Sequence, residues 1–165
     1  MDWVSDLGSP YSGATALRLS HHFTLDELIH SEYAVRMGLD NTPTSAIVTI
    51  LTRLAQKLEL VRSLLESNPV SVTSAYRSPQ VNAGIGGSST SAHMTGNAAD
   101  ILVPGYGRPV EVVKALRHRM FELNFDQIIL EYPNSPSGGW THIGFSTRPR
   151  GQVLVKHAGK PYAPL

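Results

Sequence analysis

The segment from Ser71 to Val103 constrains the fold most, because it holds a histidine and an aspartate in a stretch with few other charges. His93 and Asp100 are seven residues apart, and Asp100 lies within a run of small and then apolar residues, Asn97 to Val103. This run predicts a strand that would hold the carboxylate rigidly. Imidazole and carboxylate groups both bind zinc, and a catalytic zinc site has three protein ligands and one open position. The chain must therefore bring a third ligand to this pair from elsewhere in the sequence.

The third ligand must be a His, Asp or Glu, since the chain contains no cysteine. The best candidate is His142, which lies in the stretch Gly138-Gly-Trp-Thr-His-Ile-Gly-Phe145. A His and an Asp that only hydrogen-bond in a core are common, so the pair alone is a weak signal. The three residues His93, Asp100 and His142 together predict a site for one Zn²⁺ ion.

Composition limits the class of protein. With 165 residues, of which 41% are hydrophobic and 16% charged, we expect one ordered domain with its own core. A net charge of +1 without a Lys/Arg run argues against a nucleic-acid partner. We expect no membrane insertion, because no apolar run approaches ~20 residues. Residues 1–8 lack the basic start and apolar core of a secretory signal, so we expect cytoplasmic synthesis. We also expect the protein to be a monomer.

Capping residues and apolar periodicity predict the helices. Thr24 and Glu27 form a capping-box pattern after Phe23, which marks one helix start. The longest helix is predicted from residues 42–45 to a point near Pro69. Ser78-Pro79 predicts a short helix with Ser at the N-cap, followed by a flexible loop over 84–91 that delivers His93. Helical period returns over 109–123.

Residue types typical of strands occur at 70–76, 97–103, 125–132, 140–145 and 152–156. The turn at 132–139 joins the third and fourth into a hairpin, and we expect the last to be an edge strand. The predicted fold class is α+β, with helices packed on one side of a small, mainly antiparallel sheet in a single domain. We divide the chain into an N-terminal arm (1–22), a domain that contains the predicted zinc site (23–147) and a C-terminal tail packed on that domain (148–165).

Three separated motifs resemble those of the M15 peptidases, which include zinc D-Ala-D-Ala carboxypeptidases and phage endolysins that cut peptidoglycan stem peptides. The motifs are Tyr76-Arg77-Ser78-Pro79 followed by Asn82, then Ser91-x-His93-x-x-Gly96-x-Ala98-x-Asp100, then Trp140-x-His142. The resemblance covers roughly residues 23–147. It implies zinc-dependent hydrolysis of stem-peptide bonds, as a D,D-carboxypeptidase or an endopeptidase, with peptidoglycan peptides as partners.

The resemblance also implies roles for residues around the metal. Arg77 would be catalytic and bind substrate, because its family counterpart supports the developing oxyanion. Ser91 matches a motif position for substrate binding, although a capping role explains it equally well. Trp140 is expected to be a substrate platform or a core aromatic residue. Gln127 shares a strand face with Glu131, and we expect it among the substrate-binding residues.

The general base departs from the family pattern. Several branches of the family carry an acidic or His residue two or three positions before the last zinc His, but here these positions are Trp140 and Gly139. Strand alternation offers Glu131 instead, since Gln127 and Glu131 would share the face of His142 if the hairpin pairs suitably. We therefore expect Glu131 to be the catalytic base. The alternative for Glu131 is a charge at the mouth of the hairpin loop.

A second hypothesis is a catalytically inactive zinc-containing module, with a binding or structural role in a phage particle. The missing acidic residue before His142 and the two unassigned arms favour it. The position of Glu131 separates the two hypotheses: a carboxylate near the metal favours the enzyme, and an outward-facing one favours the module. For the enzyme, we expect action on the cell wall after release by phage or prophage lysis, or as a virion component.

Overall fold

The longest element of the computed structural model, which describes residues 16–165, is the helix α3 (Ser45–Leu64). Its N-cap is Thr44, whose side chain accepts a hydrogen bond from the backbone N–H of Ile47. The buried residues of α3 are Leu51, Leu54, Ala55, Leu58 and Val61. They recur at helical spacing, as the sequence predicted, and form one wall of the hydrophobic core. The helix ends at Leu64, a few residues earlier than predicted.

Six strands form one sheet in the order β1-β2-β4-β3-β5-β6. Their bounds are β1 (Ser71–Ser74), β2 (Ala98–Leu102), β3 (Gln127–Glu131), β4 (Trp140–Gly144), β5 (Gln152–Lys156) and β6 (Ala163–Pro164). The pairing of β3 with β5 is parallel, and the other four pairings are antiparallel. The prediction of a mainly antiparallel sheet is therefore confirmed, as is the hairpin of β3 and β4.

Short helices precede and link these strands. They are α1 (Leu25–Ile29), α2 (Glu32–Met37), α4 (Pro79–Gly84), the 3₁₀ helix η1 (Ala92–Thr95), α5 (Pro109–Leu116) and α6 (Met120–Leu123). Thr24 and Ser78 are the N-caps of α1 and α4, as predicted, and each side chain accepts a backbone N–H of the first turn. The elements α2, η1 and β6 were not predicted from the sequence.

The single helix predicted over 109–123 is wrong, because two helices occupy this stretch. The chain leaves α5 at Arg117 and makes a tighter turn, in which the N–H of Arg119 donates to the carbonyl of Leu116. The break falls at Arg117-His118-Arg119, where no apolar residue holds the chain to the core. Cationic side chains at this point also favour a helix C-terminus.

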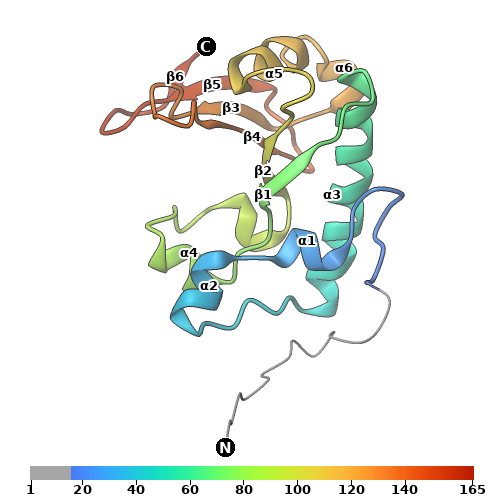
Figure 1. The fold of residues 1–165 in the computed structure, drawn as a ribbon, viewed down its shortest axis with the longest axis vertical. Coiled ribbons are helices and arrows are strands. Elements are labelled where there is room, and N and C mark those ends of the chain that lie inside the picture. Colours follow the sequence, from blue (N-terminus) through green and yellow to red (C-terminus); the bar gives the residue numbers. More distant parts are fainter. Residues whose placement is uncertain (1–15) are drawn as a thin grey trace, which may run out of the picture.

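The two faces of the sheet differ in character. One face carries Ile101, Ile128, Leu130 and Ile143, which are all buried in the core. Helix α5 packs against β3 and β4, and α3 contributes to the same apolar cluster (Figure 1). The other face carries polar side chains of β2, β3 and β4. This arrangement confirms the α+β fold class and leaves one face of the sheet for chemistry.

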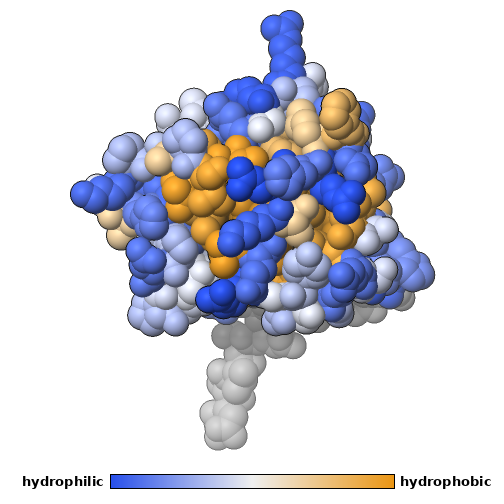
Figure 2. All heavy atoms as spheres, turned by 90° about the horizontal axis from the view of Figure 1, so that it is seen from above, coloured by the Kyte–Doolittle hydropathy of each residue, from blue (hydrophilic) through white to orange (hydrophobic). Residues whose placement is uncertain are grey.

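The C-terminal residues are part of the sheet. β5 pairs with β3 on one side and with β6 on the other, so it is not the edge strand that the sequence predicted. The end of the molecule with α5 and the last strands exposes apolar patches crossed by hydrophilic side chains (Figure 2). No helix within residues 16–165 has the length and apolar character to cross a membrane. Residues 1–15, which make up most of the predicted N-terminal arm, lie outside the described residues.

Candidate metal centre

His93 is placed by η1 and by the residues that cap it. The Ser91 hydroxyl accepts a hydrogen bond from the His93 N–H, at 3.4 Å, at the start of the helix. Gly96 ends the helix in the left-handed region, with φ +73°, which an L side chain rarely adopts. A Cβ at this position would also lie 3.3 Å from a methyl carbon of Leu51 on α3. The glycine therefore allows η1 to rest closely on the long helix.

Asp100 and His142 come from adjacent strands. They are directly paired in the antiparallel register of β2 and β4, so their side chains lie on the same face of the sheet. Asp100 is 5% exposed, His142 9% and His93 3%, so all three side chains are buried. The cluster is thus formed where η1 meets the two central strands.

Three ligand atoms converge in this cluster. His93 Nε2 lies 3.2 Å from His142 Nδ1. Asp100 Oδ1 lies 3.3 Å from His93 Nε2 and 2.9 Å from His142 Nδ1. Ligand atoms around a tetrahedral zinc with bonds of about 2.0–2.1 Å are separated by about 3.3–3.4 Å. Two sides of the triangle are close to this value, and the side between His142 Nδ1 and Asp100 Oδ1 is about 0.4 Å shorter. The donor set and its spacing therefore fit a zinc ion after a small outward movement of the side chains.

Hydrogen bonds orient the ligand atoms. The Nδ1 of His93 lies 2.6 Å from the Ala75 carbonyl oxygen, which can only accept, so Nδ1 carries the proton and the Nε2 lone pair faces the cluster. Burial lowers the pKa of His93, which favours the neutral imidazole that metals bind. Burial raises the pKa of Asp100, but the two imidazoles outweigh this and hold it below its ordinary value. The cluster therefore presents neutral His93 beside an ionised carboxylate.

Arg77, which follows β1 in the chain, contacts the cluster through Asp100. Its Nη2 donates to Asp100 Oδ2 at 2.5 Å, and its Nε donates to the Ser74 hydroxyl at 2.9 Å. Asp100 therefore directs Oδ2 to the guanidinium and Oδ1 to the two histidines. From the sequence, Arg77 was expected to bind the substrate, and its hydrogen bond to the candidate metal ligand Asp100 was not predicted.

Glu131 lies on the same face of the sheet as the cluster. Ile129 pairs with His142, and Glu131 pairs with Trp140, so the faces coincide as the predicted base required. Glu131 is half-buried. Burial raises its pKa, the Asp100 carboxylate adds to this effect, and nearby cations partly offset it. Asp126, by contrast, is held by a two-pronged ion pair with Arg150, at 2.8 and 2.5 Å.

The remaining predicted residues have local partners. Ser91 is the cap described above, and Gln127 donates from its amide nitrogen to the Gln152 side-chain oxygen at 2.8 Å. Trp140 stacks at a tilt on Tyr132, with ring centroids 5.2 Å apart. Its buried indole N–H has no hydrogen-bond partner within residues 16–165. Gln127 and Trp140 flank the row of His142 on the same face.

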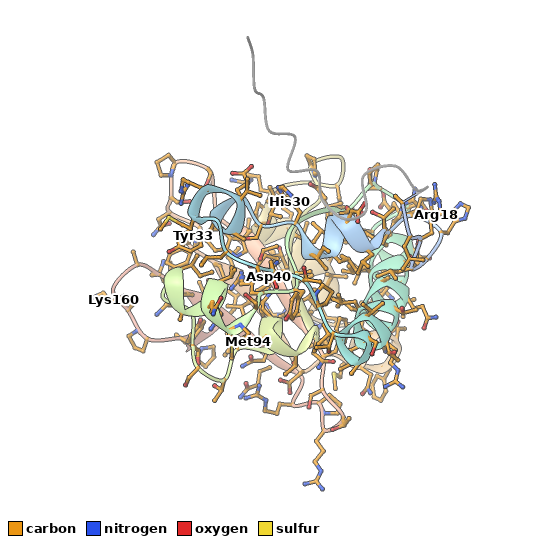
Figure 3. The ribbon with its side chains drawn as sticks, turned by 90° about the horizontal axis from the view of Figure 1, so that it is seen from below. Arg18, His30, Tyr33, Asp40, Met94 and Lys160 are labelled. Atoms are coloured by element: carbon orange, nitrogen blue, oxygen red, sulfur yellow. The ribbon has the colours of Figure 1, made fainter. Side chains whose placement is uncertain are left out.

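Figure 3 views the molecule from the end that carries α1, α2, α4 and η1. Tyr33 of α2 and Met94 of η1 lie on this side, and Lys160 marks the C-terminal loop at the rim. Three groups around the site were not predicted from the sequence: the Ala75 carbonyl on His93, the Ser74 hydroxyl on Arg77, and Lys156, which pairs with Glu131 across β5 and β3. Of these, only Lys156 could have been suspected from the sequence, because it lies at the end of the predicted strand 152–156. The partner of that strand was not predicted.

Comparison with models of known protein families gives a match to the family described as Peptidase M15, over residues 21–135. A search of curated proteins finds no match. The matched span includes Arg77, His93, Asp100 and Glu131, whereas His142 lies beyond its end.

Proposed function

The chain belongs to the M15 peptidase family, and from this premise we propose that it is a zinc-dependent peptidase that hydrolyses peptide bonds of peptidoglycan stem peptides. One observation carries the proposal: nitrogen atoms of His93 and His142 and an oxygen of Asp100 converge on the sheet face that also carries Glu131. A structural zinc site would not need a half-buried carboxylate with a raised pKa beside it.

His93, Asp100 and His142 would hold one Zn²⁺ ion through Nε2, Oδ1 and Nδ1, respectively, which are the atoms that converge in the cluster. M15 peptidases are zinc-dependent. When bound at such a site, zinc polarises a scissile carbonyl and lowers the pKa of bound water to about 7. The three protein ligands leave a fourth position, which suits a catalytic rather than a closed site.

Glu131 is the general base of this proposal. It accepts a proton from the attacking water and delivers it to the leaving amine of the cleaved peptide. The raised pKa supports this role, because a carboxylate with ordinary acidity is a weaker base near neutral pH. Because β3 is paired with β4 on one side and with β5 on the other, the backbone that carries Glu131 is held in place.

Arg77 acts first as a positioning residue. Its bonds to Asp100 and Ser74 fix which carboxylate oxygen faces the histidines. A guanidinium has five N–H donors, so others remain for a substrate carboxylate or oxyanion. Gln127 and Trp140 lie on either side of the His142–Ile129 pair on the same face of the sheet, and they would contact the peptide there. Ser91 would act indirectly, because its hydroxyl caps η1, the helix that carries His93.

The test is digestion of purified peptidoglycan, with mass analysis of the fragments. Zinc-loaded protein should release stem-peptide fragments, and a chelator should stop the release until zinc is restored. Glu131→Gln is the matched control, because it keeps the size of the side chain and removes the proton acceptor. A zinc-binding protein that cuts no stem-peptide bond would instead be the inactive module.

A further inference from the structure

The strand register forms a second row of side chains beside the ligand row. Trp140, Glu131 and Lys156 are paired across β4, β3 and β5, so their side chains share the face of the metal cluster. Val155 pairs with Ala163 on β6, which puts Tyr162 opposite Lys156. The family match ends at residue 135, so β5 and β6 lie outside it.

Lys156 in this row is a fixed cation. Its Nζ lies 4.8 Å from the centroid of the Tyr162 ring and donates to the Lys160 carbonyl oxygen. An ammonium group has three N–H donors, so two remain after this bond. Within residues 16–165, Lys156 forms no ion pair with a carboxylate. The Glu131 carboxylate on β3 is near enough for Lys156 to lower its pKa, but the two groups form no ion pair among the described residues, so N–H donors of Lys156 remain for a ligand.

A cavity of about 510 Å³ adjoins this end of the row. It is lined by Tyr132, Asn134, Ser135, His157, Ala158 and Lys160. The lining comes from the loop after β3 and the loop after β5, and it has hydrogen-bonding groups and a second ammonium but no carboxylate. A cavity of this composition suits a polar ligand with negative charge better than an apolar or cationic one.

The distance to the cluster fits a peptide that spans both places. Lys156 is two strands away from His142 and two residues further along, which separates their Cα atoms by about 11–12 Å at normal strand spacing and rise. An extended peptide covers this distance in a little over three residues, at about 3.3–3.6 Å each. A substrate whose scissile bond lies at the cluster would thus present its third residue to Lys156.

We propose that Lys156 and the adjoining cavity form a subsite for a substrate carboxylate about three residues from the scissile bond. The inference rests on the proposed function and specifies its substrate. If the scissile bond is the D-Ala-D-Ala bond of a stem peptide, the third residue before it is D-Glu, whose free α-carboxylate can be replaced by a carboxamide of the same shape. The subsite selects the carboxylate form, because a fixed ammonium attracts a charge more strongly than an amide.

Binding tests the subsite without relying on cleavage. Zinc-loaded Glu131→Gln protein is titrated calorimetrically with two stem pentapeptides, which differ only in a free or amidated D-Glu α-carboxyl group. We expect about tenfold tighter binding of the carboxylate form, as for a charge-assisted bond at a partly exposed site. Adding Lys156→Met should reduce the ratio to about one, whereas Lys156→Arg should keep most of it.

Lys114→Met is the matched control, since Lys114 is exposed on α5, which packs on the opposite face of the sheet. It should leave the tenfold ratio unchanged. Melting curves establish that each variant is folded. Equal binding of the two peptides by the parent protein, or an unchanged ratio after Lys156→Met, would overturn the subsite but leave the peptidase proposal intact. Selective binding without cleavage by wild-type protein would instead count against the peptidase alone.

Discussion

At the residue scale, the cluster separates three tasks that the sequence motifs do not distinguish. His93, Asp100 and His142 would supply the ligand atoms of the proposed zinc site. The Ala75 carbonyl and Arg77 fix the orientation of two of them. Glu131 stands one row away, close enough to share the electrostatic field of Asp100 but without a hydrogen bond to the cluster among the described residues. Substitutions should therefore affect metal binding, ligand orientation and proton transfer separately.

Glu131→Gln should leave zinc binding and the melting temperature near their wild-type values while it lowers turnover. Loss of a general base typically costs ~10²–10⁴-fold in rate. Elemental analysis gives the zinc content, and peptide hydrolysis gives the rate. If the variant loses zinc, then Glu131 is a fourth ligand and the site is closed.

The pH profile should report Glu131 as well. The residue must be ionised to accept a proton, and its pKa is raised above the ordinary 4.5. Activity should therefore fall as the pH drops through a midpoint above 4.5, and kcat/KM measured from pH 4 to 8 locates it. Lys156 is one of the cations that lower this pKa, so Lys156→Met should move the midpoint to higher pH. A shift to lower pH would contradict the assignment.

Arg77→Lys should weaken zinc binding rather than only slow catalysis. Lysine keeps the charge but cannot donate to Asp100 Oδ2 and Ser74 at the same time in a fixed fork. Loss of such an orienting partner typically costs ~10–100-fold in metal affinity or activity. A competition titration with a zinc chelator measures the affinity. Arg53→Lys, on the exposed side of α3, is the control and should change nothing.

At the element scale, local sequence was a good guide and long-range contact was not. The caps Thr24, Thr44 and Ser78 act within three residues, so the starts of three helices were predictable. Strand alternation placed Glu131 and His142 on one face because the period of two is a property of the chain itself. The contact of Arg77 with Asp100 was not predictable, since it depends on the irregular pairing of β1 with β2.

The segment before α1 is attached to α3 through Glu59. One carboxylate oxygen accepts from the Ser20 hydroxyl and the His22 N–H, and the other lies 2.7 Å from His22 Nδ1. Although burial opposes it, these hydrogen bonds lower the pKa of Glu59 to about 2. The residue therefore stabilises the fold fully above its ordinary pKa of 4.5 and loses this effect as the pH falls from there toward 2.

Glu59→Gln should lower stability at pH 7 by about 0.5–1 kcal/mol, which is the upper part of the range for a partly exposed ion pair. For a chain of this length, this corresponds to a decrease of about 1–4 °C in the melting temperature. The difference between wild type and variant should shrink as the pH falls from 4.5 toward 2. Thermal melts at several pH values measure it, and a difference that grows in acid would show that the pKa is raised instead.

At the scale of the whole molecule, the candidate metal site joins parts of the chain that are distant in sequence. His93 follows the loop after α4, Asp100 lies on β2, and His142 lies on β4, some 40 residues later. The sequence predicted these three residues together because their types and motif spacing are local signals. It could not predict the sixth strand, because two residues with a proline form it only against an existing β5.

Because the site spans these elements, zinc should stabilise the whole fold. A ligand that binds only the folded state adds about 4 kcal/mol at a thousandfold excess over its Kd. For a chain of this length, that amounts to about 8–16 °C in melting temperature. Chelation should remove this increment from the wild-type protein and restored zinc should return it.

His142→Ala tests the origin of the increment, because it removes one ligand from β4 and leaves η1 and β2 unchanged. Its melting temperature should not respond to zinc or chelator, whereas Glu131→Gln should respond as wild type does. A zinc response that survives His142→Ala would place the metal elsewhere. Equal loss of response in both variants would mean that the carboxylate on β3 also holds the ion, and the distinction between ligand and base would fail.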